Sequence, residues 1–304
     1  MPVGRVVRII GGFYYLLNEC GETIVAVPRG KLRQCGDIYV GDLVDYELLP
    51  TAQGVIEKVH PRSTVLKRPY VANVTQVALV FAHKDPDFNY VLIDRFLVML
   101  EAYHFSPLLV FNKSDLVEAD RAAENAGPYR KIGYRALCTS TKTGQGRAEM
   151  LAELAGEATT LAGPSGVGKS ALINMLAPQY QLKTGQVSEK IGRGRHTTRE
   201  VQLLPLPEVK GFLFDTPGFT KLDLDFISPR DLARYFIEFA EFSPECRFVG
   251  CLHQQEPDCA VKAAVQEGKI FPWRYENYLL FLEELKKGEA RPYPRSGENR
   301  SKRR

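Results

Sequence analysis

The sequence lacks any apolar run of the roughly 18 residues that a membrane helix needs, and its N-terminus lacks a signal-peptide pattern. Arg5 and Arg8 interrupt the first apolar stretch instead of preceding a long hydrophobic segment. Cysteine is scarce, with 6 in 304 residues, and Cys20, Cys35 and Cys138 are scattered as expected for reduced thiols. We therefore expect a cytoplasmic protein with no membrane partner.

A large excess of charge of one sign is also missing. Lys and Arg number 40 against 36 Asp and Glu, and the resulting net charge of +4 is too small to identify a nucleic-acid binder by itself. A length of 304 residues with 44% hydrophobic residues fits two or three domains with cores of their own. We expect the chain to act as a monomer.

Residues 1–64 are predicted to form a small β-barrel. Their β-rich segments are short and separated by turn residues, at 3–10, 13–17, 23–27, 40–46 and 54–59. About five such strands are typical of an OB-fold, whose exposed face commonly binds oligonucleotides, although an SH3-like barrel is an alternative. Arg29, Lys31 and Arg33 share one connection, which would either meet RNA phosphates or form a solvated loop.

Residues 65–222 follow a different pattern, after a basic, proline-flanked link at 61–69. A continuous apolar segment at 76–82 and another at 107–111 enclose a helix-periodic stretch at 91–103. Because strands and helices alternate as far as Phe214, we predict a mostly parallel sheet with helices on both faces.

A phosphate-binding loop is predicted between a buried strand at 158–162 and a helix that begins near Ser170. Its glycines let successive backbone N–H groups point at a polyphosphate, Lys169 would reach the terminal phosphates, and the Ser170 hydroxyl would ligate Mg²⁺. A glycine-rich turn that binds nothing is the alternative. The nucleotide-binding residues predicted here are Gly163, Pro164, Ser165, Gly166, Val167, Gly168, Lys169, Ser170 and Ala171.

Two further segments are predicted to read a guanine base. Asn112, Lys113, Ser114 and Asp115 follow a buried strand, where parallel sheets bind ligands. The two oxygens of the Asp115 carboxylate match the N1–H and N2–H donors of guanine, which adenine does not offer on that edge. A looser match, Ser140, Thr141 and Lys142, would offer a backbone N–H to the guanine O6, and a plain serine-glycine turn would look similar.

The two switch-like segments follow the phosphate loop. Asp215 ends a strand and would hold Mg²⁺, and the Gly218 N–H would sense the terminal phosphate. In the basic, glycine-rich loop at 192–199, Thr198 is predicted to become a ligand of the Mg²⁺ when GTP is bound, with Thr197 as the alternative. Phe219 occupies the position of the water-orienting glutamine of Ras-like enzymes, so His196 is the candidate catalytic residue, or else contacts only RNA or solvent.

The order of these segments predicts a circular permutation, because the base-reading loops precede the phosphate loop. Ordinary GTPases have the reverse order, and a sheet whose termini lie close together tolerates the rearrangement. One physical consequence is that the segment from Asp215 to Gly218 leads straight into the C-terminal region.

Residues 223–304 are predicted to form a mostly α-helical zinc-binding domain with a basic tail. Helical segments are expected at 228–239 and 273–287. Between them, three cysteines and one histidine supply the four ligands of a structural tetrahedral zinc site, with buried free thiols or disulfides as alternatives. The predicted ligands are Cys246, Cys251, His253 and Cys259. The tail from Arg291 would touch RNA or only aid solubility.

Together these motifs resemble the RsgA family, also called YjeQ, over nearly the whole chain. The resemblance implies an OB-fold, a permuted GTPase domain and a zinc-binding domain. It further implies binding to the small ribosomal subunit and its rRNA, a role in late maturation of that subunit, and GTP hydrolysis to GDP that the subunit stimulates. Thr141 and Arg199 depart from the usual residues, and Arg199 leaves the choice of magnesium-binding threonine open. The alternative function is a GTP-gated RNA-binding module in which hydrolysis is incidental.

Overall fold

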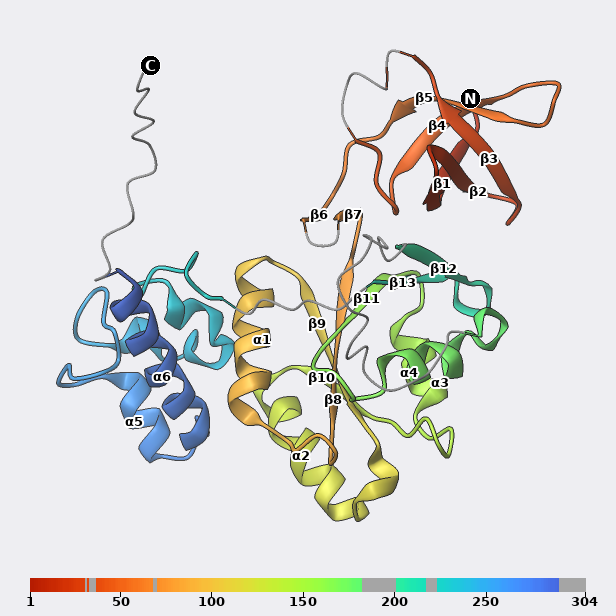
Figure 1. Ribbon diagram of the computed structural model, residues 1–304. Helices are drawn as coiled ribbons and strands as arrows, with labels where there is room; N and C mark the ends of the chain where they lie inside the picture. Colours follow the sequence, from red (N-terminus) through yellow and green to blue (C-terminus); the bar gives the residue numbers. More distant parts are fainter. Residues whose placement is uncertain (31, 33–36, 68–69, 182–200, 217–222, 290–304) are drawn as a thin grey trace, which may run out of the picture. The chain divides into compact units, whose positions relative to one another are not determined.

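The chain divides into two compact units (Figure 1). The first contains residues 1–89 and 103–222, and the second contains residues 90–102 and 223–304. The computed structural model describes residues 1–30, 32, 37–67, 70–181, 201–216 and 223–289. The predicted domain boundaries after residues 64 and 222 stay predictions.

The first unit begins with the five-stranded barrel. Its strands are β1 (Val3–Ile10), β2 (Phe13–Asn18), β3 (Thr23–Pro28), β4 (Leu43–Leu48) and β5 (Gly54–Val59). They follow the order β1-β2-β3-β5-β4, and β4 pairs back with β1, so the sheet closes on itself. Only β3 and β5 run parallel among these pairs. This closed arrangement confirms the predicted OB-fold. Its interior is filled by side chains that include Val6, Leu16, Val44 and Ile56.

A second set of strands in the same unit forms the predicted, mostly parallel sheet. They are β8 (Gln76–Ala82), β9 (Ser106–Asn112), β10 (Arg135–Cys138), β11 (Ala158–Ala162), β12 (Gln202–Leu206) and β13 (Gly211–Asp215). The order is β10-β9-β8-β11-β13-β12, with only β12 antiparallel to its neighbour β13. Every residue of β8 and β11 is buried, as expected for strands covered on both faces.

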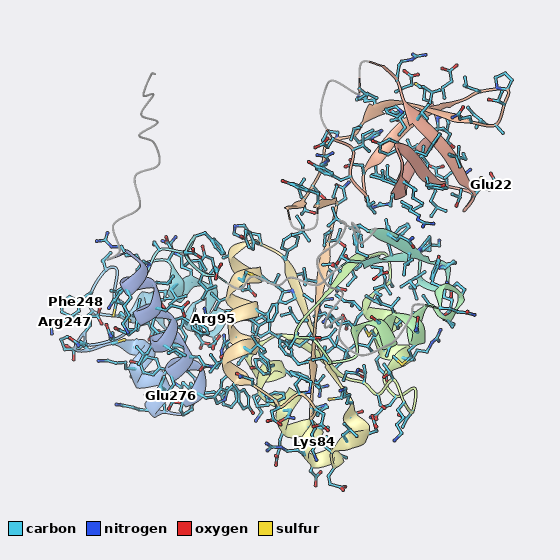
Figure 2. The ribbon with its side chains drawn as sticks, viewed as in Figure 1. Glu22, Lys84, Arg95, Arg247, Phe248 and Glu276 are labelled. Carbon is cyan, nitrogen blue, oxygen red and sulfur yellow. The ribbon has the colours of Figure 1, made fainter. Side chains whose placement is uncertain are left out.

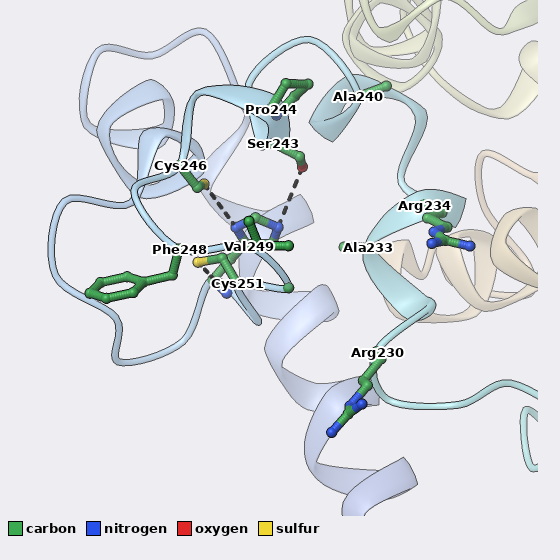
Figure 3. Close-up of a pocket in the computed structure, with 12 residues that line it drawn as sticks. Arg230, Ala233, Arg234, Ala240, Ser243, Pro244, Cys246, Phe248, Val249 and Cys251 are labelled. Carbon is green, nitrogen blue, oxygen red and sulfur yellow. Dashed lines mark hydrogen bonds between the residues drawn. The ribbon is translucent and has the colours of Figure 1, made fainter.

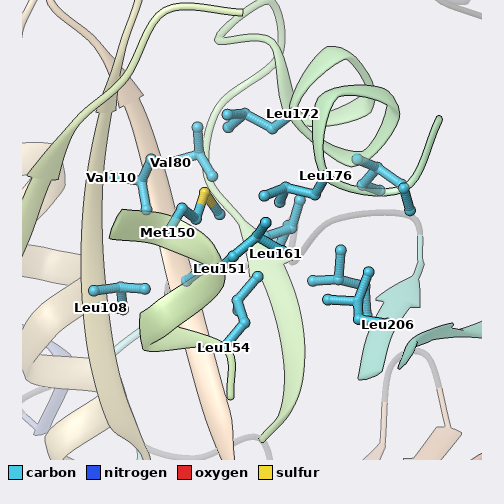
Figure 4. Packing of buried hydrophobic residues seen from close by; sticks show 14 of the residues in the cluster. Val80, Leu108, Val110, Met150, Leu151, Leu154, Leu161, Leu172, Leu176 and Leu206 are labelled. Carbon is cyan, nitrogen blue, oxygen red and sulfur yellow. The ribbon is translucent and has the colours of Figure 1, made fainter. Parts of the chain in front are cut away.

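Helices of this unit pack on the sheet through aliphatic side chains. They are α2 (Ala119–Ile132), α3 (Arg147–Glu153) and α4 (Lys169–Leu176), with short 3-10 turns η2 (Ser114–Leu116), η3 (Pro178–Tyr180) and η4 (Pro207–Val209). Met150 of α3 and Leu172 of α4 meet Val80, Val110 and Leu161 of three neighbouring strands (Figure 4). Burial of each such side chain contributes roughly 1.5–3 kcal/mol, so this cluster fixes the strand ends that carry the loops described below.

A two-stranded hairpin, β6 (Val65–Lys67) and β7 (Tyr70–Ala72), lies in the stretch that the sequence predicted to be only a link. Three-residue strands are too short to show a period, which explains the omission. Asn73, at φ 57°, accepts a 2.9 Å hydrogen bond from the Ser63 N–H and donates a 3.0 Å bond to the Gly41 carbonyl. The hairpin is therefore tied to the barrel by side-chain as well as backbone contacts.

The second unit is helical. It contains α1 (Tyr90–Ala102), α5 (Ala260–Gln266), α6 (Pro272–Glu289) and the 3-10 turns η5 (Leu232–Tyr235), η6 (Ile237–Phe239) and η7 (Ser243–Glu245). The continuous helix predicted at 228–239 is wrong. Phe236 is extended, with ψ 92°, and this break buries both Phe236 and Phe239 against Tyr278 at ring distances of 5.4 and 5.1 Å. Aromatic packing overrides the local helical pattern here.

Candidate nucleotide site and metal centre

The phosphate loop lies between β11 and α4, in the strand-loop-helix context that the motif requires. Gly163 has φ 134° and Gly168 has φ 97°, in the region that favours glycine. A Cβ atom on Gly163 would lie 2.1 Å from the Val80 carbonyl oxygen, and one on Gly168 would lie 2.4 Å from Asn112 Nδ2. Both positions therefore exclude a side chain by backbone conformation and by close approach of the neighbouring strands.

The phosphate loop is also fixed from inside. Val167 is fully buried, and its carbonyl accepts a 2.8 Å hydrogen bond from Asn112 Nδ2. Lys169 Nζ donates to the carbonyls of Gly163 at 2.9 Å and Pro164 at 2.6 Å, and burial lowers the pKa of this ammonium group. A positive group beside backbone N–H groups at a helix N-terminus is suited to bind a polyphosphate.

The predicted base-reading residues meet at the carboxyl ends of β9 and β10. Ser140 Oγ donates a 2.6 Å hydrogen bond to Asp115 Oδ1 and accepts a 3.2 Å bond from the Thr143 N–H. Thr139 Oγ1 lies 3.2 Å from Asn112 Oδ1. Asn112 thus joins the predicted base-reading loop both to the 139–146 turn and to the phosphate loop, and Ser140 orients the carboxylate of Asp115.

Two contacts at this end of the sheet were missed from the sequence. The Lys113 ammonium donates to the backbone carbonyl of Asp85, in the loop that follows β8. Ser114 Oγ donates a 2.9 Å hydrogen bond to the Gln145 side chain. A backbone acceptor carries no sequence signal, and Gln145 lies 31 residues from its partner.

Asp215 is the last residue of β13, which is the parallel neighbour of β11. The carboxyl ends of parallel neighbours share one edge, so Asp215 lies at the edge that carries the phosphate loop and Ser170. Burial raises the pKa of the Asp215 carboxyl group. The other residues predicted for this part of the site, His196, Thr197, Thr198 and Gly218, lie outside the described residues.

The four predicted metal ligands converge in the second unit, and their donor atoms all lie within 4.8 Å of one another. The Cys246 and Cys259 sulfurs are 3.8 Å apart, and His253 Nδ1 lies 3.5 Å from Cys246 Sγ and 3.4 Å from Cys259 Sγ. In a tetrahedral zinc site, metal–ligand distances of about 2.3 Å for sulfur and 2.0–2.1 Å for nitrogen place two sulfur ligands about 3.8 Å apart, and a sulfur and a nitrogen ligand about 3.6 Å apart. A disulfide needs about 2.05 Å between sulfurs. The cluster therefore can bind one metal ion and is compatible with zinc.

Contacts around the cluster orient its ligands. Ser243 Oγ lies 3.4 Å from His253 Nε2, the ring nitrogen that faces away from the cluster. The backbone N–H of His253 donates a hydrogen bond to Cys251 Sγ at 3.4 Å. A partner on the second imidazole nitrogen fixes the tautomer that a metal needs. A cavity of about 440 Å³ adjoins the cluster and is lined by three of its ligands and by Arg230 and Arg234 (Figure 3).

A buried ionic network in the second unit was also missed from the sequence. Arg274 of α6 is fully buried and binds Asp94 of α1 at 2.8 Å and Glu238 of η6 at 2.6 Å. Asn277 Nδ2 donates a 2.6 Å hydrogen bond to Asp94 Oδ2. Burial raises the pKa of Asp94 to about 6, while Arg274 and Asn277 act in the opposite direction. Arg95, which is labelled on α1 in Figure 2, also pairs with Glu284 of α6. The network and this pair together fasten α1 to α6.

Among the helices of the described residues, none combines the length and the apolar character needed to cross a membrane.

Comparison with known proteins gives family matches over residues 3–225 and relatives that align with nearly the whole chain. Residues 3–56 match the RsgA N-terminal domain and residues 59–225 match the RsgA GTPase family. A relative from Caldanaerobacter subterraneus, named small ribosomal subunit biogenesis GTPase RsgA, is 47% identical over 95% of this chain and 98% of its own length. A relative of the same name from a Geobacillus species is 45% identical over 96% of this chain and 100% of its own length.

Two solved structures resemble the chain along nearly all of its length. YjeQ from Thermotoga maritima has a TM-score of 0.78 and 39% identity, and covers 93% of this chain and 98% of its own. YloQ, described as a circularly permuted GTPase, has a TM-score of 0.80 and 34% identity, and covers 96% of this chain and 97% of its own.

Proposed function

The chain belongs to the RsgA GTPase family, and from this premise we propose that it is a GTP-hydrolysing factor in the biogenesis of the small ribosomal subunit. It binds that subunit, acts late in its maturation, and hydrolyses GTP faster when bound to it. The proposed partner surface is rRNA, and the proposed setting is the cytoplasm, with the chain as a monomer.

One observation supports this function best: the hydrogen bond from Asn112 to the Val167 carbonyl. It joins the loop that would read guanine to the loop that would bind phosphates, although 55 residues separate them in reversed order. We assign the base to Asp115, with Ser140, Thr141 and Lys142 beside it, and the phosphates to residues 163–171 and Gly218.

The experiment that tests the proposal measures GTP hydrolysis with and without purified small subunits at several salt concentrations. We expect stimulation by the subunit that weakens as salt rises, because phosphate contacts release counterions. A rate that is the same with and without subunits at low salt would contradict the proposed partner.

Magnesium fits the same edge of the sheet. We propose that Ser170, Asp215 and Thr198 hold Mg²⁺ when GTP is bound, with Thr197 as the alternative to Thr198. Oxygen ligands are those that Mg²⁺ prefers, and the ion would neutralise charge on the terminal phosphates. The residues of this chain bind the nucleotide and orient it, and the half-buried carboxyl group of Asp215 gains its charged form when a cation lies beside it.

We further propose that Cys246, Cys251, His253 and Cys259 hold one structural Zn²⁺, because all four ligand positions are filled. Protein purified without chelator should contain about one zinc per chain, and Cys259→Ser should lower this to well below one. Metal analysis by mass spectrometry checks both. Cys20→Ser, which alters an exposed cysteine outside the cluster, should keep full zinc content. Wild-type protein with clearly less than one zinc would contradict the assignment.

His196 is proposed to position or activate the attacking water, because Phe219 cannot. His196→Ala should lower subunit-stimulated turnover by roughly 100-fold or more with GTP affinity unchanged. Single-turnover hydrolysis and nucleotide binding measure the two effects separately, and His104→Ala, at an exposed histidine, is the matched control. If His196→Ala retains full stimulated turnover, the residue is not catalytic.

If a hydrolysis-deficient variant still leaves the subunit normally, the GTP-gated binding module gains support.

A further inference from the structure

We propose that the stacked side chains of Arg62, Tyr39 and Tyr70 form a platform on which one unpaired base of a single-stranded RNA stacks. The platform lies where the β6–β7 hairpin meets the barrel, and none of its three residues belongs to the predicted nucleotide site or to the metal cluster. The proposal rests on the proposed rRNA partner and names a site for it.

The three groups are layered one on the next. The Arg62 guanidinium lies 4.2 Å from the centre of the Tyr39 ring, and the Tyr39 and Tyr70 ring centres are 5.2 Å apart with an interplanar angle of 18°. The Tyr39 ring thus contacts both a cation and the Tyr70 ring. Tyr70 keeps 56% of its surface exposed, so its ring can accept a further stacking partner.

Asp42 holds the stack in place. Its carboxylate is fully buried and accepts hydrogen bonds from Arg62 Nε at 2.7 Å and Arg62 Nη2 at 2.8 Å. The same carboxylate accepts a 2.8 Å bond from the Tyr39 backbone N–H. The Asp42 carboxylate raises the pKa of Arg62, so the guanidinium stays charged. Because these bonds order the stack before any ligand arrives, a base that adds to it loses little further side-chain entropy in the protein.

The aromatic surface and the basic character of this segment indicate the kind of ligand that the platform binds. An exposed aromatic ring that extends an ordered cation–aromatic stack is the surface that nucleobases use, because every base has a π-face. The segment that carries Arg62 and Tyr70 suits a polyanion, since no Asp or Glu occurs in sequence between Glu57 and Asp85, and the nearby Asp42 carboxylate is itself neutralised by Arg62. In that stretch Lys67 pairs with Tyr70 in the hairpin register and Arg68 follows it in the sequence.

The test uses the full-length chain, a short unstructured oligoribonucleotide labelled with 2-aminopurine, and purified small subunits. Tyr70→Ala should raise the Kd for the oligoribonucleotide roughly 5- to 150-fold, whereas Tyr70→Trp should keep it near the wild-type value. The 2-aminopurine fluorescence should be quenched on binding to wild type and Tyr70→Trp but not to Tyr70→Ala. Tyr103→Ala, at a tyrosine that is 53% exposed elsewhere in the unit, is the matched control and should bind normally.

Three results would overturn the platform. Tyr70→Ala could bind RNA as well as wild type, or Tyr70→Trp could lose binding as fully as Tyr70→Ala, which would indicate a structural role. Tyr70→Ala could also weaken subunit binding alone, which would indicate a protein contact. GTP affinity, measured on every variant, reports on the nucleotide site independently. Wild-type protein that binds the oligoribonucleotide but not subunits would refute the proposed function and leave the platform standing.

Discussion

Asp115→Asn should change the preferred nucleotide from GTP to xanthosine triphosphate. In the proposed assignment, the Asp115 carboxylate of the wild-type chain offers two acceptors to the N1–H and N2–H donors of guanine. The amide replaces one acceptor by a donor, which opposes the guanine N2 donors but matches the carbonyl that xanthine carries there. One hydrogen bond to a charged group contributes about 1.5–3 kcal/mol, so loss of the bond to the guanine N2 donor should lower GTP affinity by roughly 10- to 150-fold.

The Ser140 hydroxyl determines how the asparagine side chain should be oriented in this variant. It donates to Asp115 Oδ1, so the corresponding oxygen of the asparagine should keep this bond and the amide nitrogen should face the base. Competition of xanthosine and guanosine triphosphates for a fluorescent nucleotide measures the preference in both variants. Asp120→Asn, in the first turn of α2, carries the same change of charge away from the base and should leave GTP preference intact. An Asp115→Asn variant that still prefers GTP would refute the base-reading role.

The local parts of the nucleotide site could be predicted from sequence because each depends on neighbours in the chain. The glycines at 163 and 168 and the strand at 158–162 form one contiguous pattern, and the structure places them in the predicted context. The five barrel strands were likewise visible as short segments between turn residues. The four metal ligands lie within 14 residues, 246–259, so their spacing alone indicated a cluster.

The parts that were missed depend on distant partners or on backbone groups. Lys113 binds a backbone carbonyl, which any residue at position 85 could offer. The helical period at 228–239 was real as a pattern, but burial of Phe236 and Phe239 selected two 3-10 turns instead. The hairpin that carries Tyr70 has strands of three residues, below the length at which alternation can be recognised. Tertiary packing decides such segments.

Arg274→Ala should destabilise the second unit by about 3–5 kcal/mol, because it leaves Asp94 and Glu238 buried without their cation. Removal of one partner of a buried ionic group costs more than the group contributes as a whole, since the remaining charges stay desolvated. Trp273 is the single tryptophan of the chain and precedes Arg274 in α6, 4.4 Å from the ring of Tyr90 in α1. Its fluorescence during urea unfolding therefore reports on the contact between these two helices.

The control variants separate desolvation from loss of an ion pair. Arg234→Ala removes an exposed pair with Asp231 in the same unit, 3.1 Å apart, and should change stability by less than about 1 kcal/mol. Replacing Asp94, Glu238 and Arg274 together by apolar residues of similar size should cost far less than Arg274→Ala alone, because no buried charge remains. If the free energy of unfolding of Arg274→Ala lies within about 1 kcal/mol of the wild-type value, the network does not hold α1 to α6. The triple variant contains none of the three buried charges. If it is as unstable as Arg274→Ala, the loss of stability therefore comes from changed packing and not from uncompensated charge.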